Sequence, residues 1–244
     1  MLNKKNFYID GKWVSPVESR NYNVIDPSNE EPCAEISLGG KKDIDNAVSA
    51  AKKAFGIWAF SQKEESLKLL EELYFIYKKR WADMAKLITF EMGAPMKFST
   101  EMQAATGSSH IKSFKNILKD FKFEKDLGEE KNNQKLLNEP KGVRALITPW
   151  NWPINQLNLK VIPALASACT VVLKPSEIAP LSSMLLAEMI DEAKFPPGVF
   201  NLVNGDGGIT GDALTSHPDV NMISFTGSTR AGSLISQNAA KDFK

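Results

Sequence analysis

The sequence of 244 residues contains only two cysteines, Cys33 and Cys169, and only two histidines. Two cysteines cannot build the disulfide framework on which small secreted domains depend. Because histidine and cysteine are so scarce, no group of side chains has the spacing of a zinc site, and we expect no metal centre. This composition is typical of a protein of the reducing cytoplasm, which is the compartment that we expect.

Long apolar runs and long basic runs are missing as well. A membrane-spanning helix needs about 20 apolar residues in succession, and no stretch of this sequence comes near that length. The first residues, Met1 to Asn6, contain no apolar core of the kind that a signal peptide has. The formal net charge is +1, so the charge balance favours neither nucleic acid nor an anionic membrane as a partner.

The first forty residues predict two pairs of short strands. Phe7–Val14 surrounds Asp10-Gly11, and an Asp-Gly pair is the strongest short-range signal for a hairpin turn. A second extended pair is expected on either side of Asp26-Pro27. From about Asp43 the apolar residues recur at helical spacing, so the chain changes there from strands to helices.

Two long helices are expected next. Ser61 and Glu64 have the spacing of a capping box, and they predict the start of a helix that runs to about Phe90. A second helix follows Pro95 and continues to about Lys119.

Between Phe121 and Asn138 the sequence is polar and rich in charge. Asp126–Glu129 is expected to form a turn. A linker and a protruding hairpin both fit this composition.

From residue 143 onward, short apolar strands alternate with helices. The expected strands span 143–147, 170–173, 199–203 and 222–225, and the expected helices span 154–168, 181–194, 209–216 and a final segment after 226. Such alternation is typical of right-handed βαβ units and a parallel sheet with helices on both faces. We therefore expect an α/β fold with a Rossmann-like, doubly wound parallel sheet, which binds ligands beyond the carboxyl ends of its strands.

The first of these strands leads into Thr148–Pro153, in which two prolines lie on either side of Asn151. Because proline restricts the backbone, the side chain of Asn151 is held in a nearly fixed place. An amide in such a place can donate a hydrogen bond to an oxyanion that forms during a reaction. The alternative is a turn asparagine that bonds only its own backbone.

The second strand ends at Lys174, and Glu177 follows three residues later. A lysine and a carboxylate at the carboxyl end of a Rossmann strand suit the hydroxyl groups of an adenosine ribose. The alternative is a surface ion pair, which would contribute little stability.

The third strand leads into the glycine-rich segment Gly205–Gly211, where a ligand can approach the backbone closely at a helix start. Thr210 interrupts the standard G-x-G-x-x-G spacing, which would in any case follow the first strand. The fourth strand ends before Ser228, whose hydroxyl and the free amides of the following helix suit a pyrophosphate. Ser233 stands where a P-loop has its lysine, so hydrolysis of a nucleoside triphosphate is excluded.

Taken in order, the ends of these four strands resemble the aldehyde dehydrogenase superfamily. The segments that carry the resemblance are Glu139–Val143, Thr148–Pro153, Lys174–Glu177, Phe195–Asn201 and Phe225–Gly232, together with Phe7–Val14 and Glu91–Pro95. The resemblance covers essentially the whole chain. It implies an NAD(P)-dependent oxidoreductase that converts an aldehyde into a carboxylic acid.

The resemblance also assigns roles to residues. It makes Asn151 the side-chain donor to the oxyanion, and it places Trp152 and Gln156 at the mouth of an aldehyde tunnel. NAD is the expected cofactor, because Glu177 would repel the 2′-phosphate of NADP; Lys174 and Ser176 could partly offset this, which leaves NADP possible. The residues implied for cofactor binding are Ile147, Thr148, Pro149, Trp150, Lys174, Ser176, Glu177, Gly207, Gly211, Phe225, Thr226, Gly227, Ser228 and Gly232.

A division of the chain follows from the same resemblance. Residues 1–120 would form the N-terminal hairpins and helices of the cofactor domain, 121–139 a protruding arm for homo-oligomerisation, and 140–244 the Rossmann-like core. The catalytic domain and the final strand of the sheet would be absent. The strand 222–225 would then be an exposed apolar edge, which favours pairing or aggregation.

In that family a cysteine thiolate attacks the aldehyde and a glutamate activates water. Both residues follow the Phe-Thr-Gly-Ser segment: the cysteine lies in a Gly-Gln-x-Cys motif, and the glutamate lies before Gly-Gly-Lys. The sequence to Lys244 contains neither motif. Cys169 lies at the entrance to a buried strand and Cys33 in the N-terminal strands, so neither is expected to replace the nucleophile. We therefore expect a cofactor-binding part that is inactive alone; the alternatives are a non-catalytic dinucleotide-binding module and one half of a split enzyme.

Overall fold

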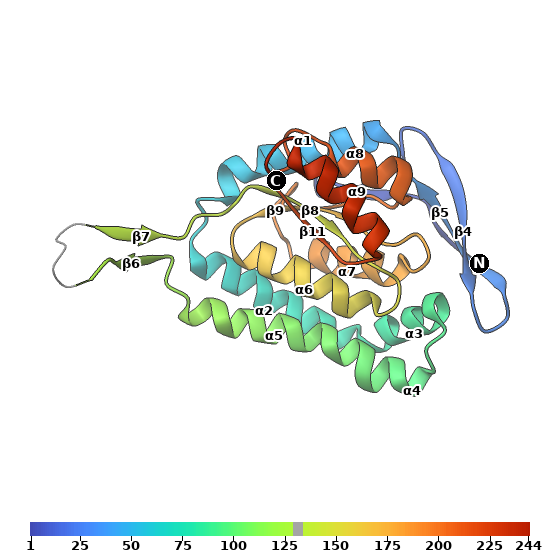
Figure 1. Cartoon of the computed structure of the whole chain (residues 1–244). Helices are drawn as coiled ribbons and strands as arrows, with labels where there is room; N and C mark the ends of the chain where they lie inside the picture. The colour runs from blue at the N-terminus through green and yellow to red at the C-terminus, as the bar shows by residue number, and fades with distance from the viewer. Residues whose placement is uncertain (129–133) are drawn as a thin grey trace.

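The computed structural model describes residues 1–128 and 134–244. A six-stranded sheet lies between two layers of helices (Figure 1). α1 (Lys41–Trp58) and α8 (Asp212–Thr215) cover one face, and α9 (Thr229–Ala240) packs against α8. The other face is covered by α6 (Pro153–Ala166) and α7 (Leu181–Glu192). Outside α6 lie α2 (Lys63–Lys79) and α5 (Ala104–Asp120).

The strands of this sheet have the order β11-β8-β9-β10-β2-β3. Four of them are parallel, namely β8 (Val143–Ile147), β9 (Thr170–Lys174), β10 (Phe200–Leu202) and β11 (Met222–Phe225). The α/β class and the doubly wound parallel core are therefore confirmed. β11 lies at one edge of the sheet and is half-buried along its whole length.

The N-terminal hairpin of β2 (Phe7–Ile9) and β3 (Lys12–Val14) extends the same sheet in the antiparallel direction. Asp10 (φ 52°) and Gly11 (φ 72°) both have a left-handed backbone, which is the type I′ geometry that the Asp-Gly pair predicts. The amide of Asp10 donates to Asn201 Oδ1 over 3.0 Å, which anchors the turn to β10. The sequence pattern shows the hairpin but not its place in the sheet, because that place depends on residues 191 positions apart.

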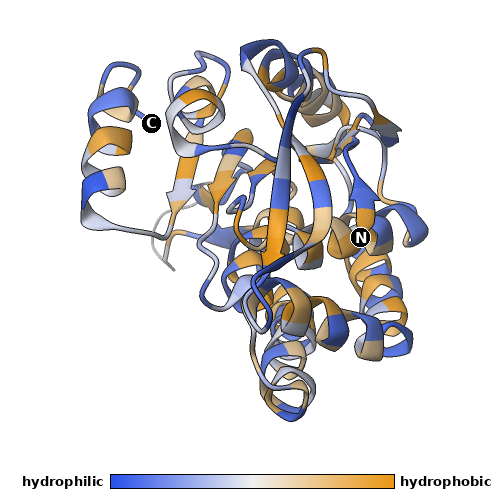
Figure 2. Cartoon of the chain, turned by 90° about the vertical axis from the view of Figure 1, so that its right-hand side faces the viewer, coloured by the Kyte–Doolittle hydropathy of each residue, from blue (hydrophilic) through white to orange (hydrophobic). Residues whose placement is uncertain are grey.

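A smaller sheet has the order β1-β5-β4. The antiparallel pair of β4 (Arg20–Asp26) and β5 (Glu31–Leu38) confirms the extended pair predicted around Asp26-Pro27, and β1 (Leu2–Lys4) joins it in parallel. This sheet faces the viewer in Figure 2, where its strands carry both hydrophilic and hydrophobic residues. Val24 and Ile36 are fully buried on the side that faces the core.

The capping box predicted at Ser61 and Glu64 is wrong. α2 begins at Lys63 with Gln62 as its N-cap, and no side chain caps it. Ser61 Oγ is buried without a hydrogen-bond partner among the described residues. The local spacing was right for a capping box, but the N-cap position falls on Gln62, one residue after the serine.

The single helix predicted to Phe90 is in fact two helices. Arg80 (φ −98°, ψ 19°) leaves the helical conformation between α2 and α3 (Trp81–Met92). Its guanidinium donates to Glu188 of α7 over 2.7 Å, a tertiary contact that no local pattern shows.

The helix predicted after Pro95 is continuous but not uniform. It consists of α4 (Met96–Phe98), the π-helical segment η1 (Ser99–Gln103) and α5. Gln103 and Ser99 are buried at the π-helical segment, where the chain packs against α3.

The polar stretch after α5 is a protruding hairpin. β6 (Glu124–Asp126) and β7 (Lys135–Leu137) pair antiparallel and project from the body of the molecule (Figure 1). A hairpin, rather than a linker, is thus the interpretation that the structure supports. The turn predicted at Asp126–Glu129 lies partly outside the described residues.

Within residues 1–128 and 134–244, no helix is both long enough and apolar enough to cross a bilayer. The same residues contain no group of three or more histidine, cysteine or acidic side chains placed to hold a metal ion.

A buried carboxyl group fixes the start of α7. Glu91 of α3 is 1% exposed and accepts hydrogen bonds from the backbone amides of Leu181 and Ser182, the latter over 3.0 Å. Burial raises the pKa of Glu91 to about 7, and the hydrogen bonds oppose this only in part. The folded chain therefore keeps this proton at pH values at which the unfolded chain has lost it, so stability falls as pH rises from 4.5 to about 7.

We predict that Glu91→Gln removes this pH dependence, because the amide does not titrate. One pKa unit corresponds to about 1.4 kcal/mol, so the wild-type chain should lose about 2 to 3 kcal/mol of unfolding free energy relative to the variant between pH 5 and pH 8. Urea denaturation at both pH values measures this. If the free energies of unfolding of the two proteins differ by the same amount at pH 5 and at pH 8, the raised pKa of Glu91 is contradicted.

Candidate functional site

A cavity of about 480 Å³ opens at the carboxyl ends of β8, β9 and β11. Its walls are the π-helical segment η2 (Gly207–Gly211) with α8 on one side and α9 on the other. Parallel strands bring their carboxyl ends to one edge, so residues far apart in the sequence meet there. Six of the residues predicted for cofactor binding line this cavity: Ile147, Lys174, Gly207, Gly211, Phe225 and Ser228.

The other predicted cofactor residues do not line the cavity but belong to the segments next to residues that do. They are Thr148, Pro149 and Trp150 after β8, Ser176 and Glu177 after β9, and Thr226, Gly227 and Gly232 around the start of α9. Two larger cavities, of about 540 and 620 Å³, lie between the small sheet and α3 and at the base of the β6–β7 hairpin. Neither is at the carboxyl edge of the parallel strands, where this fold binds its ligands.

Glycines keep one wall of the cavity open. A Cβ atom at Gly207 or Gly208 would meet no other atom within 4 Å, so a ligand can reach the backbone there. Gly205 has a different role, because its Cβ would lie 2.0 Å from Thr210 Oγ1. That glycine is required for packing within the turn.

The opposite wall is the start of α9. Ser228 is the N-cap, and its Oγ accepts from the amide of Ala231 over 3.2 Å. Arg230 and Ala231 in the first turn line the cavity with it. Backbone amides, the positive end of a helix dipole and a guanidinium group together suit an anion. Gly227 makes room for the ring of Phe225, since a Cβ there would lie 2.4 Å from that ring.

Lys174, at the end of β9, is 3% exposed. Its Nζ donates to the carbonyl oxygens of Pro175 (2.7 Å) and Gly205 (2.6 Å), and it lies 3.6 Å from Glu177 Oε2. Burial lowers the pKa of Lys174, while the charge of Glu177 opposes this. A surface ion pair, the alternative for these two residues, does not describe a lysine so deeply buried. Two of its three donors join the loops after β9 and β10, and the third faces the carboxylate of Glu177.

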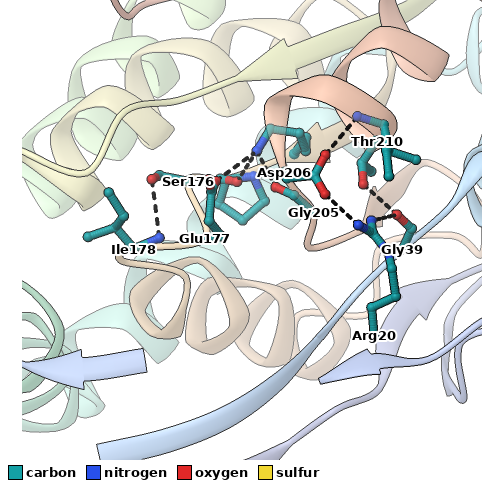
Figure 3. A network of polar contacts seen from close by, with 11 residues as sticks. Arg20, Gly39, Ser176, Glu177, Ile178, Gly205, Asp206 and Thr210 are labelled. Carbon is teal, nitrogen blue, oxygen red and sulfur yellow. Dashed lines mark hydrogen bonds and ion pairs between the residues drawn. The ribbon is translucent and has the colours of Figure 1, made fainter. Parts of the chain in front are cut away.

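Near Glu177 the loop after β9 makes its own polar contact, since Ser176 Oγ accepts from the amide of Ile178 over 3.3 Å (Figure 3). Glu177 itself is half-buried, with 29% of its side chain exposed. Its side chain is therefore partly open to solvent beside Lys174, which lines the cavity.

Asn151 lies in the loop between β8 and α6. Thr148 at the start of this loop is buried, and its amide donates to the carbonyl of Lys174 over 3.3 Å, which ties the loop to β9. Trp150 and Asn151 are exposed. The hydrogen bonds among the described residues do not include the Asn151 side chain, so the alternative of an asparagine that bonds its own backbone has no support.

Trp152 is the N-cap residue of α6, and its Nε1 is buried without a partner among the described residues. Its ring centroid lies 6.1 Å from that of Phe98 in α4. Gln156 is one turn further along α6 and is half-buried. Both residues predicted at the mouth of a tunnel thus share the start of α6 with Asn151.

Several polar residues of this region were not predicted. Lys160 of α6 donates to Thr226 Oγ1 over 2.7 Å, and burial lowers its pKa. His110 Nε2 and Asn155 Oδ1 are 2.7 Å apart. Arg230 could have been recognised from its place directly after the Ser228 cap, whereas the other contacts join residues distant in the sequence.

The parallel sheet and the cavity at its carboxyl edge define the doubly wound α/β class. Within that class, the sequence model described as "Aldehyde dehydrogenase family" matches residues 13–244, and the chain belongs to this family.

Similar proteins support the same assignment. The chain is 49% identical over its whole length to a 3-succinoylsemialdehyde-pyridine dehydrogenase of a Pseudomonas species, of which it covers 50%. It superposes on the crystal structure of an aldehyde dehydrogenase from Bartonella henselae with a TM-score of 0.98 at 55% identity, covering 100% of this chain and 51% of that one. For a mutant aldehyde dehydrogenase C from Pseudomonas syringae, complexed with NAD⁺ and octanal, the TM-score is 0.95 at 42% identity, with 98% and 49% covered. The chain thus spans about half the length of the relatives that it matches.

We predict that Lys174→Met destabilises the chain. The substitution leaves the buried carbonyls of Pro175 and Gly205 without their shared donor, so the free energy of unfolding should fall by about 2 kcal/mol or more. Lys160→Met, which removes a single half-buried hydrogen bond, should lower it by no more than about 1 kcal/mol. Urea denaturation of the three proteins decides this, and equal losses in both variants would show that Lys174 does not join the two loops.

Proposed function

We propose that this chain supplies the NAD⁺ site of an NAD⁺-dependent aldehyde dehydrogenase, an enzyme that oxidises an aldehyde to a carboxylic acid. The observation that carries the proposal is the cavity between η2 and α9, with Lys174, Gly207 and Ser228 in its walls. It lies where a doubly wound sheet binds nucleotides. A relative of 42% identity was crystallised with NAD⁺ and an aldehyde.

The residues of the cavity fit the parts of a dinucleotide. The pair of Lys174 and Glu177, whose carboxylate is partly exposed, suits the hydroxyls of the adenosine ribose. The open glycine wall and the start of α9 at Ser228 suit the pyrophosphate. Leu234 of α9 lines the same cavity with about half of its surface exposed, which offers apolar contact to the adenine ring. Trp150 would pack near the cofactor beyond these groups.

When bound, NAD⁺ supplies the acceptor for the hydride that leaves the aldehyde carbon. Asn151 would hold the oxygen of the aldehyde through its side-chain amide, which is exposed and free to donate. Trp152 and Gln156, at the start of the same helix, would guide the aldehyde toward Asn151.

Neither cysteine of the chain is placed to attack an aldehyde. Cys169 is fully buried just before β9, at the amino edge of the sheet, opposite to the cavity. Cys33 belongs to the small sheet, is half-buried, and has its pKa raised by burial. We propose that the attacking thiolate and the general base come from outside residues 1–244, as in a longer protein or a separate chain. A non-catalytic dinucleotide-binding module is the competing proposal.

Cofactor choice and assembly are part of this proposal. Glu177 would repel the 2′-phosphate of NADP, so NAD⁺ is preferred. Residues 140–244 would bind the dinucleotide, with 1–120 packed around them. The arm formed by 121–139 exposes Leu136 and Leu137 on β7, which suits contact with a second copy in a homo-oligomer.

We predict that Gly207→Leu abolishes NAD⁺ binding and leaves the chain folded. Gly207 lines the cavity and a Cβ there meets no atom within 4 Å, so the added side chain should occupy space that the ligand needs, and the free energy of unfolding should change by less than about 1 kcal/mol. Gly56→Leu is the matched control, because a Cβ at this exposed helical glycine also meets no atom within 4 Å. Isothermal titration calorimetry measures binding. Equal NAD⁺ affinity in the Gly207 variant and the control would reject this cavity as the site.

We also predict that residues 1–244, assayed alone with NAD⁺ and a panel of aldehydes, form no NADH. The reason is the position of the two thiols, since Asn151 stabilises a charge that neither thiol can create. The measurement is absorbance at the NADH band. Turnover that Cys169→Ser or Cys33→Ser abolishes would contradict the prediction. The competing proposal of a non-catalytic dinucleotide-binding module also predicts no turnover.

A further inference from the structure

We propose that Arg20, in the small sheet, is a positioning residue for the cofactor cavity, because its guanidinium fixes the turn that carries the glycine wall. This inference rests on the proposed function and goes beyond it, since Arg20 belongs neither to the six-stranded sheet nor to the wall of the cavity.

Arg20 holds the turn through Asp206. Its Nη1 lies 2.6 Å from Asp206 Oδ2, and the other oxygen of that carboxylate accepts from the amide of Ile209 over 2.7 Å (Figure 3). The backbone carbonyl of Asp206 accepts from the amide of Gly211 over 3.0 Å. The side chain that Arg20 binds is thus the one that caps η2, directly before Gly207 and Gly208 of the cavity wall.

A second contact of Arg20 prevents the turn from shifting. Its Nη2 donates to the carbonyl of Gly39 over 2.9 Å, and the hydroxyl of Thr210 donates to the same oxygen. The amide of Gly39 in turn donates to the carbonyl of Asn204 over 2.8 Å. Arginine can reach both acceptors because its donors are fixed in a planar fork, which a lysine lacks.

The strand that carries Arg20 lies next to the ribose end of the site. Tyr22 follows two positions later on the same face of β4, and its pKa is raised by burial and by the charge of Glu177. Lys174 donates to the carbonyl of Gly205, directly before Asp206. The turn is therefore held from the sheet by Lys174 and from β4 by Arg20, and removal of either contact frees one side of the wall.

The test compares Arg20→Ala with Arg80→Ala in the full chain. Arg80 is a matched control, because it pairs with Glu188 over 2.7 Å at similar exposure and far from the cavity in the fold. We expect the Kd for NAD⁺, measured by calorimetry, to rise about tenfold in Arg20→Ala. A rise of this size corresponds to a variant in which the turn adopts its binding-competent conformation about one tenth of the time. Arg80→Ala should leave it unchanged, while the melting temperatures of both variants shift by similarly small amounts, since half-exposed ion pairs contribute little stability.

Hydrogen exchange provides a readout that needs no cofactor. The amides of Ile209 and Gly211 should exchange about tenfold faster in Arg20→Ala and at the wild-type rate in Arg80→Ala. Arg20→Lys should restore part of the affinity, because it keeps the charge near Asp206 but not the contact with Gly39. In the double variant Arg20→Ala/Asp206→Asn, the loss of NAD⁺ affinity should not exceed the larger of the two single-variant losses, since each change breaks the same interaction.

Four outcomes decide between the proposals. Wild-type chain that binds no NAD⁺ overturns the proposed function and, with it, the cofactor role of Arg20. If the wild-type chain binds NAD⁺ and Arg20→Ala has the same NAD⁺ affinity and the same amide hydrogen exchange, the Arg20 proposal alone is overturned. Additive losses in the double variant, or an equal rise of Kd in Arg80→Ala, would also overturn it, since Arg20 would then act elsewhere or only through general stability.

Discussion

One ammonium group, that of Lys174, holds together the two loops that follow β9 and β10. It lies almost entirely out of solvent and donates to the carbonyls of Pro175 and Gly205. A buried charge loses its hydration, so these carbonyls and the nearby carboxylate of Glu177 must replace water. The loop that carries the glycine wall cannot move away from β9 without breaking the bond from this ammonium to the carbonyl of Gly205.

Other elements complete the site around this constraint. Thr148 ties the Asn151 loop to the backbone of Lys174, Ser228 closes the start of α9, and Arg20 reaches the glycine-rich turn from the small sheet. Each contact joins a different segment of the chain to the same edge of the parallel sheet. The cavity therefore depends on segments distant in the sequence, including the small N-terminal sheet, which carries no residue of its wall.

Local signals in the sequence were enough to predict much of this architecture. The alternation of apolar strands and helices predicts the parallel core, and the Asp10-Gly11 pair predicts a type I′ turn, because both depend on neighbouring residues. The helix that follows Ser228 was expected for the same reason, although the role of Ser228 as its N-cap was not predicted. Ser61 shows the limit of such signals, since a capping-box spacing occurs there without a cap.

Contacts between distant segments could not be predicted in this way. The ribose role proposed for Lys174 followed from its place at a strand end, but its bond to Gly205, 31 residues away, did not. Arg20 and Asp206 are 186 positions apart, so no local pattern relates them. The break at Arg80 and the entry of the N-terminal hairpin into the main sheet are of the same kind, because tertiary packing decides both.

The most direct test of the account is a crystal structure of this chain with NAD⁺. The account predicts the adenosine ribose within hydrogen-bond distance of Lys174 and Glu177, and the pyrophosphate between Gly207 and the start of α9 at Ser228. A nucleotide bound in another cavity, or a saturated crystal in which this cavity stays empty, would contradict it.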